Sequence, residues 1–230
     1  MIVLFDIDGT LVKAGGVGKA ALELAFLELH GVRDALESVR LDGNTDRRIV
    51  EEMFATALGR EPTEGEALEL SERYLSRLAE ALDRSESRYQ VLPGATDLLT
   101  ALSAKGHAAI GLATGNLERG ARTKLAPADL NRFFGFGGYG SDARLRVDIV
   151  RVAVDRGLAI AEERWGRRPG REEIFVLGDT DRDVHAAREA GVRSVGILAG
   201  AGSPDALYAA KPDLVVDSME DRGLWSLLGL

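Results

Sequence analysis

The chain has 230 residues, of which 45% are hydrophobic and 29% are charged, a composition typical of a globular protein with a sizeable core. It has no cysteine, which excludes disulfide bonds and thiolate metal sites, and no stretch approaches the roughly 18 apolar residues of a membrane helix. The net charge of -8 argues against a nucleic-acid partner, because such proteins usually carry a basic patch.

The first expected element is a short buried strand. Residues Ile2 to Phe5 are all apolar, and Asp6 and Asp8 follow them directly. Met1 leads straight into this strand, without the basic region and apolar segment of a secretory signal. We therefore expect a cytoplasmic protein whose first strand ends at two closely spaced carboxylates.

Residues 15–88 show only helical patterns. The segment GVGKAALELAFLELHG has apolar residues at helical spacing and ends at Gly31. Thr45 or Asp46 is a suitable cap for a second helix that stops near Gly59, and the pair Thr63 and Glu66 forms a capping box for a third. This pattern predicts an all-helical cap domain over residues 15–89, joined to the rest of the chain by linkers near 13–17 and 86–93.

From residue 91 onward, helices and strands alternate. The pattern predicts helices near 94–105, 117–125, 144–165, 181–191 and 203–210, a terminal helix, and strands near 108–114, 133–140, 173–179, 194–200 and 213–217. Such alternation is typical of a parallel sheet covered by helices on both faces. We expect an α/β fold with a Rossmann-like core formed by residues 1–14 and 90–230.

Polar side chains follow three of the expected strands. Asp6 and Asp8 follow the first, Thr114, Gly115 and Asn116 the second, and Asp179 and Asp183 another. Ligands of open parallel sheets bind beyond the carboxyl ends of the strands, so these side chains are expected to converge. Two like charges about 4 Å apart repel by roughly 4 kcal/mol near a protein surface, and a hard cation such as Mg²⁺ would relieve that repulsion and bridge to phosphate oxygens.

These motifs resemble those of the haloacid dehalogenase (HAD) superfamily of phosphohydrolases. DIDGT at 6–10 matches the first motif, Thr114 in LATGN the second, and GDTDRD at 178–183 the fourth. The helical insert after the first strand resembles the first cap type of that superfamily. The pattern GNTD at 43–46 and the order of the core motifs resemble phosphoglycolate-type phosphatases.

The resemblance implies a role for each matched residue. Asp6 would be the nucleophile that forms an aspartyl-phosphate, and Asp8 the general acid and base, oriented by Thr10. The metal ligands would be Asp6, the backbone carbonyl of Asp8, Asp179 and Asp183, with Mg²⁺ as the cofactor. An alternative to the metal-site role of Asp183 is that it only caps its helix or forms a pair on it.

The phosphate-binding group implied by the resemblance is Thr114, Gly115, Asn116 and a basic residue, the third motif of the superfamily. Many members carry a lysine just before the helix leading to the fourth motif, but YGSDARLRVDIV has none there. Lys124 is the leading candidate for this positive charge. Arg146 and Arg144 are the alternatives.

The function expected from these features is a magnesium-dependent phosphatase acting on a small phosphorylated metabolite, phosphoglycolate-like or a sugar phosphate. Asp8 argues against the dehalogenase branch, which lacks this second carboxylate. A phosphomutase of the β-phosphoglucomutase kind is the alternative, although Thr10 favours hydrolysis, and a non-catalytic phosphate-ligand protein is a remote one. The natural substrate, and whether the protein is a monomer or a homodimer, stay open.

Overall fold

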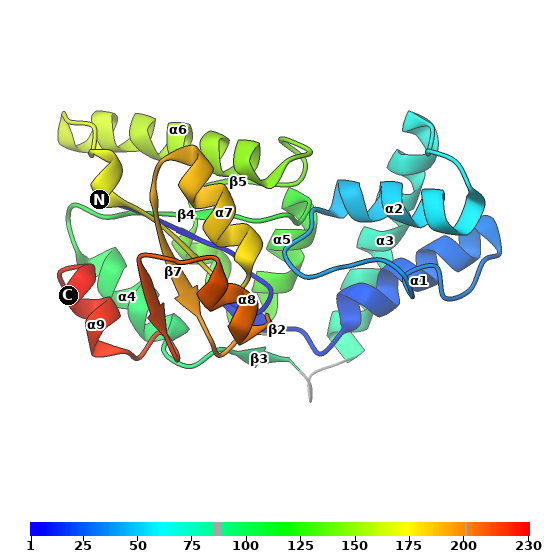
Figure 1. Cartoon of the computed structure of the whole chain (residues 1–230), viewed down its shortest axis with the longest axis horizontal. Helices are drawn as coiled ribbons and strands as arrows, with labels where there is room; N and C mark the ends of the chain where they lie inside the picture. The colour runs from blue at the N-terminus through cyan, green and yellow to red at the C-terminus, as the bar shows by residue number, and fades with distance from the viewer. Residues whose placement is uncertain (85–88, 201) are drawn as a thin grey trace.

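The computed structural model describes residues 1–84, 89–200 and 202–230, and a six-stranded parallel sheet forms the centre of this part of the chain (Figure 1). Its strand order is β5-β4-β1-β6-β7-β8. The strands are β1 (Ile2–Phe5), β4 (Ala109–Ala113), β5 (Phe136–Gly138), β6 (Ile174–Gly178), β7 (Arg193–Ile197) and β8 (Leu214–Val216). The expected α/β fold with a parallel sheet is confirmed.

Strand β1 lies in the middle of the sheet. Val3 is paired with Ile110 of β4 on one side and with Phe175 of β6 on the other. The ladder continues past the strand, because the Asp6 N–H donates to the Leu177 carbonyl at 2.9 Å. The carboxyl ends of β4, β1 and β6 therefore meet at one edge, which is where a parallel sheet binds its ligands.

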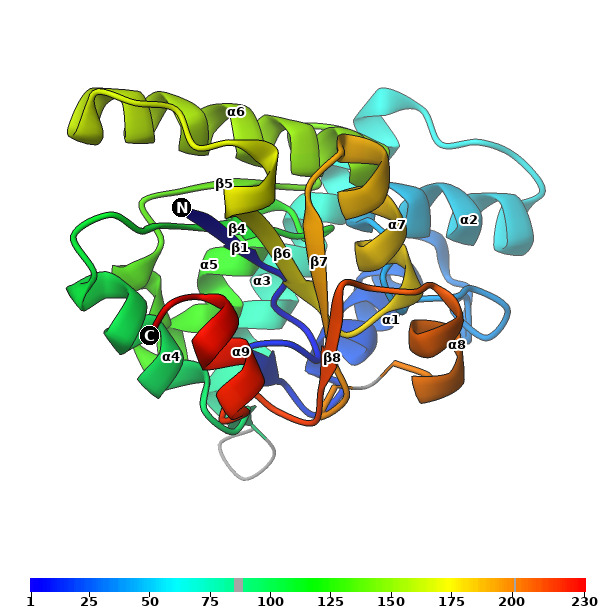
Figure 2. The ribbon, with the colours of Figure 1, turned by 60° about the vertical axis from the view of Figure 1, so that its left-hand side comes forward.

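Helices cover both faces of the sheet, as Figure 2 shows. In β1, Ile2 and Leu4 pack toward α6 and α7, whereas Val3 and Phe5 face the apolar cluster that includes α4, α5 and α9. The helices of this region are α4 (Ala95–Ala104), α5 (Glu118–Leu125), α6 (Arg146–Trp165), α7 (Asp181–Ala190), α8 (Pro204–Ala209) and α9 (Arg222–Leu227). Short 3-10 turns occupy Ala126–Ala128, Leu130–Phe133 and Arg171–Glu173. Within the described ranges no helix is both long and apolar enough to cross a membrane.

Three further helices lie to one side of the sheet in Figure 1: α1 (Val17–His30), α2 (Asp46–Leu58) and α3 (Glu64–Arg84). They pack around their own apolar cluster, in which Phe26, Phe54 and Leu78 are fully buried. The division into core and cap at 14/15 and 89/90 stays a prediction, and residues 86–88 of the second expected linker lie outside the described residues.

The helix boundaries in this group follow the expected local signals. Thr45 Oγ1 accepts a hydrogen bond from the Arg48 N–H at 3.3 Å, which makes Thr45 the cap of α2. Thr63 and Glu66 form the expected capping box at the start of α3. Gly31 and Gly59 end α1 and α2 with φ angles of 71° and 69°, a left-handed conformation that glycine adopts without strain.

A two-stranded antiparallel pair, β2 (Val12–Lys13) with β3 (Gln90–Val91), was not expected. Val12 pairs with Val91, so the segment that enters the helical group and the segment that leaves it lie side by side. Two-residue strands are too short for hydrophobic periodicity to reveal them. Their pairing depends on how the chain returns after more than seventy residues.

Candidate active site

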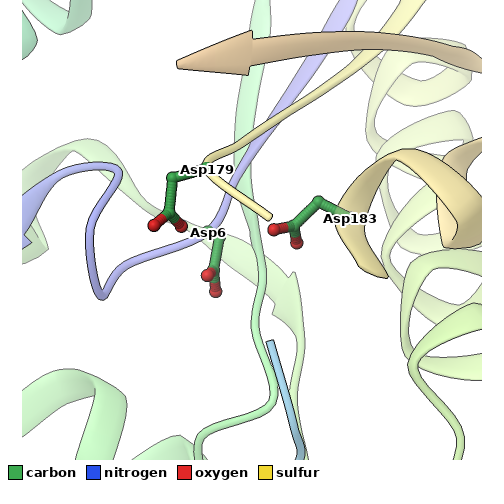
Figure 3. Close-up of side chains that lie close together, drawn as sticks. All are labelled: Asp6, Asp179 and Asp183. Carbon is green, nitrogen blue, oxygen red and sulfur yellow. The ribbon is translucent and has the colours of Figure 1, made fainter. Parts of the chain in front are cut away.

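Three buried carboxylates gather at the carboxyl edge of the sheet (Figure 3). Asp6 follows β1, Asp179 follows β6 and Asp183 lies in the first turn of α7. One oxygen of each lies within 4.8 Å of the others, and the three residues are 5%, 3% and 2% exposed. The sequence predicted that these three side chains converge, and the structure brings them together.

Asp183 is held in place by the start of α7. Its Oδ2 accepts hydrogen bonds from the Thr180 hydroxyl at 2.6 Å and the Thr180 N–H at 3.2 Å, in a capping box. A Cβ on Gly178 would lie 2.3 Å from Asp183 Cγ, so only glycine leaves room for the carboxylate there. Asp183 thus caps its helix and faces the cluster at the same time, and its two expected roles are compatible.

Asp179 is held by backbone and hydroxyl donors. The Gly202 N–H donates to its Oδ2 at 3.1 Å, and the Thr10 hydroxyl lies 3.4 Å from its Oδ1. Thr10 was expected to orient Asp8, but the contact that the structure describes for its hydroxyl is with Asp179. The second residue after the DxD pair therefore supports another carboxylate of the cluster.

Arg146, at the first position of α6, places a positive charge beside Asp6. Its Nη2 lies 2.9 Å from Asp6 Oδ1 and also pairs with Asp183 Oδ1, and its side chain is 9% exposed. Desolvation nevertheless raises the pKa of Asp6 to about 6; Arg146 opposes the rise, and Asp183 and Asp8 add to it. One guanidinium does not neutralise the cluster.

The donor set of this cluster fits a divalent cation such as Mg²⁺. All three groups offer carboxylate oxygens, which hard cations prefer. Asp6 Oδ1 is buried, and among the described residues its ion-pair contact with Arg146 lacks hydrogen-bond geometry. Buried oxygens of this kind are unfavourable without a cation or a proton. The side chain of Asp8 lies outside this three-carboxylate group.

A second polar cluster surrounds Asp8. Lys124 Nζ, from α5, donates to Asp8 Oδ2 at 2.6 Å and to Asn116 Oδ1 at 2.7 Å, and Asn116 Nδ2 donates to Asp8 Oδ2 at 2.9 Å. Desolvation acts to raise the pKa of Asp8, but Lys124 and the hydrogen bonds outweigh it and hold that pKa below its usual value. The Asp8 side chain is still 47% exposed, so it can meet a bound molecule.

The loop between β4 and α5 carries the expected phosphate-binding residues. Thr114 is fully buried, and its Oγ1 accepts from Asn116 Nδ2 at 2.8 Å. Among the described residues, no acceptor is found for the Gly115 N–H. This N–H is a donor that an incoming oxyanion can use.

The two candidate cations for the third motif both lie at the site. Lys124 contacts Asp8, and Arg146 contacts Asp6 and Asp183. Arg144 instead forms an ion pair with Glu51 of α2 at 2.6 Å, and its side chain is 61% exposed. Which of Lys124 and Arg146 corresponds to the family motif stays a prediction.

A cavity of about 390 Å³ lies above both clusters and extends between the sheet edge and α1–α3. The core side of the cavity is lined by Asp6, Asp8, Lys124 and Arg146, among others. The opposite wall is formed by residues of the helical group: Gly18, Lys19, Leu22, Leu36, Leu41, Asp42, Asn44, Asp46, Ile49 and Tyr74.

Two of these lining residues, Tyr74 and Asp46, were not anticipated as site residues. Asp46 had a signal, since it follows the Thr45 cap, whereas nothing in the spacing around Tyr74 distinguishes it from a packing residue.

A family model described as haloacid dehalogenase-like hydrolase matches residues 1–191. Phosphoglycolate phosphatases of Shigella boydii and Escherichia coli K12 are each 28% identical to the chain, and each comparison covers 99% of this chain and 92% of the relative.

Solved structures share the fold. CbbY from Rhodobacter sphaeroides in complex with phosphate superposes with a TM-score of 0.72 at 21% identity, covering 100% of this chain and 99% of that one. A hydrolase from Pseudomonas syringae gives a TM-score of 0.69 at 24% identity, covering 96% of this chain and 94% of that one. At such identities the similarity concerns the fold alone.

Proposed function

Because this chain belongs to the haloacid dehalogenase-like hydrolase family, we propose that it hydrolyses a small phosphorylated metabolite through an aspartyl-phosphate on Asp6. The enzyme is a phosphoric monoester hydrolase, like the phosphatases that it resembles over its whole length. The observation that carries the mechanism is the meeting of Asp6, Asp179 and Asp183 within 4.8 Å at the carboxyl ends of β1 and β6. A phosphoglycolate-like compound or a sugar phosphate is the proposed substrate class.

The first chemical step takes place at Asp6. A carboxylate oxygen of Asp6 attacks phosphorus, and the bond between phosphorus and the ester oxygen breaks. Asp8, when protonated, gives its proton to the departing oxygen. Because Lys124 favours the ionised form of Asp8, this proton transfer requires Asp8 to loosen from Lys124 as substrate binds.

The second step regenerates Asp6. Asp8, now a carboxylate, accepts a proton from a water molecule whose oxygen attacks the phosphorus of the aspartyl-phosphate. The bond between phosphorus and Asp6 breaks, and inorganic phosphate is released. The half-exposed position of the Asp8 side chain, two residues after Asp6, supports this double role.

The remaining residues bind and orient the phosphoryl group. Thr114 and the N–H of Gly115 offer hydrogen bonds to its oxygens, and Arg146 and Lys124 supply positive charge on either side. Mg²⁺, held by Asp6, Asp179 and Asp183 with the Asp8 carbonyl, would neutralise the carboxylates and the phosphate charge.

We further propose that α1–α3 act as a cap. They line one wall of the cavity, so their closure would exclude water from the leaving-group side and select the substrate. The proposed cap spans residues 15–89 and the core residues 1–14 and 90–230.

A phosphate-release assay tests the function directly. The purified protein is supplied with Mg²⁺ and p-nitrophenyl phosphate, and the Asp6→Asn variant is compared with it. The variant should lose at least about 10³-fold in kcat, because an amide cannot act as the nucleophile. Retained activity in Asp6→Asn would contradict the mechanism.

Asp42→Asn is a matched control. Asp42 lines the same cavity but belongs neither to the three-carboxylate cluster nor to the polar cluster around Asp8. This variant should keep its activity on p-nitrophenyl phosphate. A panel of phosphorylated metabolites, assayed for free phosphate and for isomerised sugar phosphate, separates hydrolysis from phosphomutase activity.

A further inference from the structure

Asp46, at the first position of α2, reaches from the helical group onto the loop between β4 and α5. Its backbone N–H donates to the Gly115 carbonyl at 2.9 Å, and its Oδ2 accepts from the Leu117 N–H at 2.8 Å. One residue of α2 thus binds the loop on both sides of Asn116. Leu117 directly precedes α5, the helix that carries Lys124.

The contact between the two segments is close enough to require glycine. A Cβ on Gly115 would lie 2.2 Å from the Asn44 carbonyl oxygen and 2.9 Å from Thr45 Cα. No side chain fits at this position while residues 44–46 are docked. Glycine at position 115 is therefore what allows residues 44–46 of the helical group to approach the loop this closely.

The opposite side of the loop is held by the core. The Gly140 N–H donates to the Asn116 carbonyl at 2.8 Å, and a Cβ on Gly140 would lie 2.2 Å from the Gly115 carbonyl oxygen. The loop is thus clamped between Gly140 of the core and Asp46 of α2. If α2 moved away, one of the two sides of the clamp would be lost.

We propose that Asp46 is a positioning residue for phosphate binding, which couples docking of the helical group to the geometry of the loop. Docked Asp46 holds the peptides on either side of Asn116, so that the Gly115 N–H and the Thr114 hydroxyl are directed at the phosphoryl group. When the group undocks, the Leu117 N–H loses its acceptor and the loop is held from one side only. This inference rests on the proposed function, because the phosphoryl group is the ligand of the loop.

Ion pairs elsewhere also join the helical group to the core without touching this loop. Arg144 pairs with Glu51 at 2.6 Å, and Arg40 pairs with Asp181 at 2.8 Å. A purely structural role for Asp46 would make its loss equivalent to the loss of one of these pairs. The Glu51→Gln variant is therefore the matched control for docking as such.

The experiment compares Asp46→Ala, Asp46→Asn and Glu51→Gln with the wild type. The readouts are inhibition by inorganic phosphate, with kcat and KM for p-nitrophenyl phosphate, in the presence of Mg²⁺. Asp46→Ala should weaken phosphate inhibition and raise KM by about tenfold, the effect of losing one hydrogen bond to a charged group. Asp46→Asn keeps an acceptor oxygen for Leu117 and should recover most of the loss, and Glu51→Gln should stay within about threefold of wild type.

Equal effects of Asp46→Ala and Glu51→Gln would overturn the proposal, as would an Asn variant as impaired as the Ala variant. Amide hydrogen exchange at Leu117, measured by NMR without phosphate, gives a readout that needs no turnover. Leu117 should exchange faster in Asp46→Ala than in Glu51→Gln, and equal exchange in the two would contradict the clamp. If exchange responds as expected but the wild type releases no phosphate, the proposed function fails and the clamp stands.

Discussion

Asp6 combines burial, negative charge and proximity to two other carboxylates. Desolvation is the largest contribution to its pKa of about 6, against about 3.9 for an aspartate in an unfolded chain. Between these values the folded protein retains a proton that the unfolded chain has released. The contribution of Asp6 to the free energy of unfolding therefore falls as the pH rises through this window and is constant on either side of it.

Magnesium binding should consequently depend on pH. The cation competes with the proton on Asp6, so Mg²⁺ should raise the thermal unfolding midpoint little at about pH 5 and clearly more at about pH 7.5. Differential scanning fluorimetry with and without Mg²⁺ measures this. The Asp46→Asn variant is the control, since the pKa of Asp46 is also raised to about 6 by desolvation, yet Asp46 lies outside the three-carboxylate cluster. A pH-independent shift would contradict the assignment of Asp6 as a ligand.

Arg146 should matter for stability as well as for binding. Replacing it by Met leaves Asp6 and Asp183 buried without their counter-charge, which costs about 3–5 kcal/mol in the free energy of unfolding when no metal is present. Urea unfolding with and without Mg²⁺ checks this, and Mg²⁺ should restore part of the loss.

Lys124→Met is the comparison for that measurement. It should cost less stability, because its partner Asp8 is 47% exposed and can be solvated. A Lys124→Met variant less stable than Arg146→Met would contradict this ranking of the two cations.

The start of α7 shows how a secondary-structure element positions a functional group. Thr180 is the cap of the helix, and Asp183 completes the capping box while facing the carboxylate cluster. The same hydrogen bonds that begin the helix also hold the rotamer of a predicted metal ligand. Gly178 ends β6 without a side chain and so leaves space for that carboxylate.

Thr180→Ala should therefore reduce both stability and magnesium affinity. The loss of the cap costs about 1 kcal/mol, and Asp183 Oδ2 loses its hydroxyl donor. Ser203→Ala removes the cap of α8 and is the matched control, because the Ser203 hydroxyl accepts from the Ala206 N–H and Ser203 is not a member of the three-carboxylate cluster. Both variants should lose stability in chemical denaturation, but only Thr180→Ala should weaken the Mg²⁺-induced stabilisation. Equal Mg²⁺ responses in the two variants would argue against Asp183 as a ligand.

The helical group and the sheet are joined by contacts of several kinds. The pairs Arg144–Glu51 and Arg40–Asp181 involve exposed side chains, whereas Asp46 and the loop at Gly115 meet through close backbone contacts. Tyr89 packs against the apolar clusters of both parts, and its hydroxyl donates to the Lys124 carbonyl at 2.8 Å. The cavity lies between the two parts, so under the proposed cap function their separation would control access to Asp6.

A high salt concentration should favour separation of the helical group from the sheet, because the exposed ion pairs between them are screened at high ionic strength. Raising NaCl from about 50 mM to about 500 mM should accelerate amide exchange of Asp46 and Leu117 several-fold. Exchange at Val3, in the central strand, should not change, and it serves as the internal reference in the same NMR measurement. Uniform acceleration at all three amides would indicate global destabilisation instead.

Much of this architecture could be predicted because its signals are local. Alternation of helices and strands predicted the parallel sheet, and DIDGT and GDTDRD predicted which carboxylates would converge. The capping signals at Thr45 and Thr63 correctly marked helix starts. The β2–β3 pair and the role of Thr10 beside Asp179 escaped prediction, because each joins residues far apart in sequence through contacts with no periodic pattern.

The residue pattern was sufficient to establish the fold class and the identity of the acidic cluster, because strand ends in a parallel sheet meet at one edge whatever the details of packing. The positions of the cations and of Asp46 required the folded chain. In the sequence, Lys124 and Arg146 were alternative candidates for the single positive charge of the third motif. In the folded chain both lie at the site, Lys124 beside Asp8 and Arg146 beside Asp6. The approach of Asp46 to Gly115 depends on how two separately packed parts dock, and such docking is set by surface complementarity that linear spacing does not record.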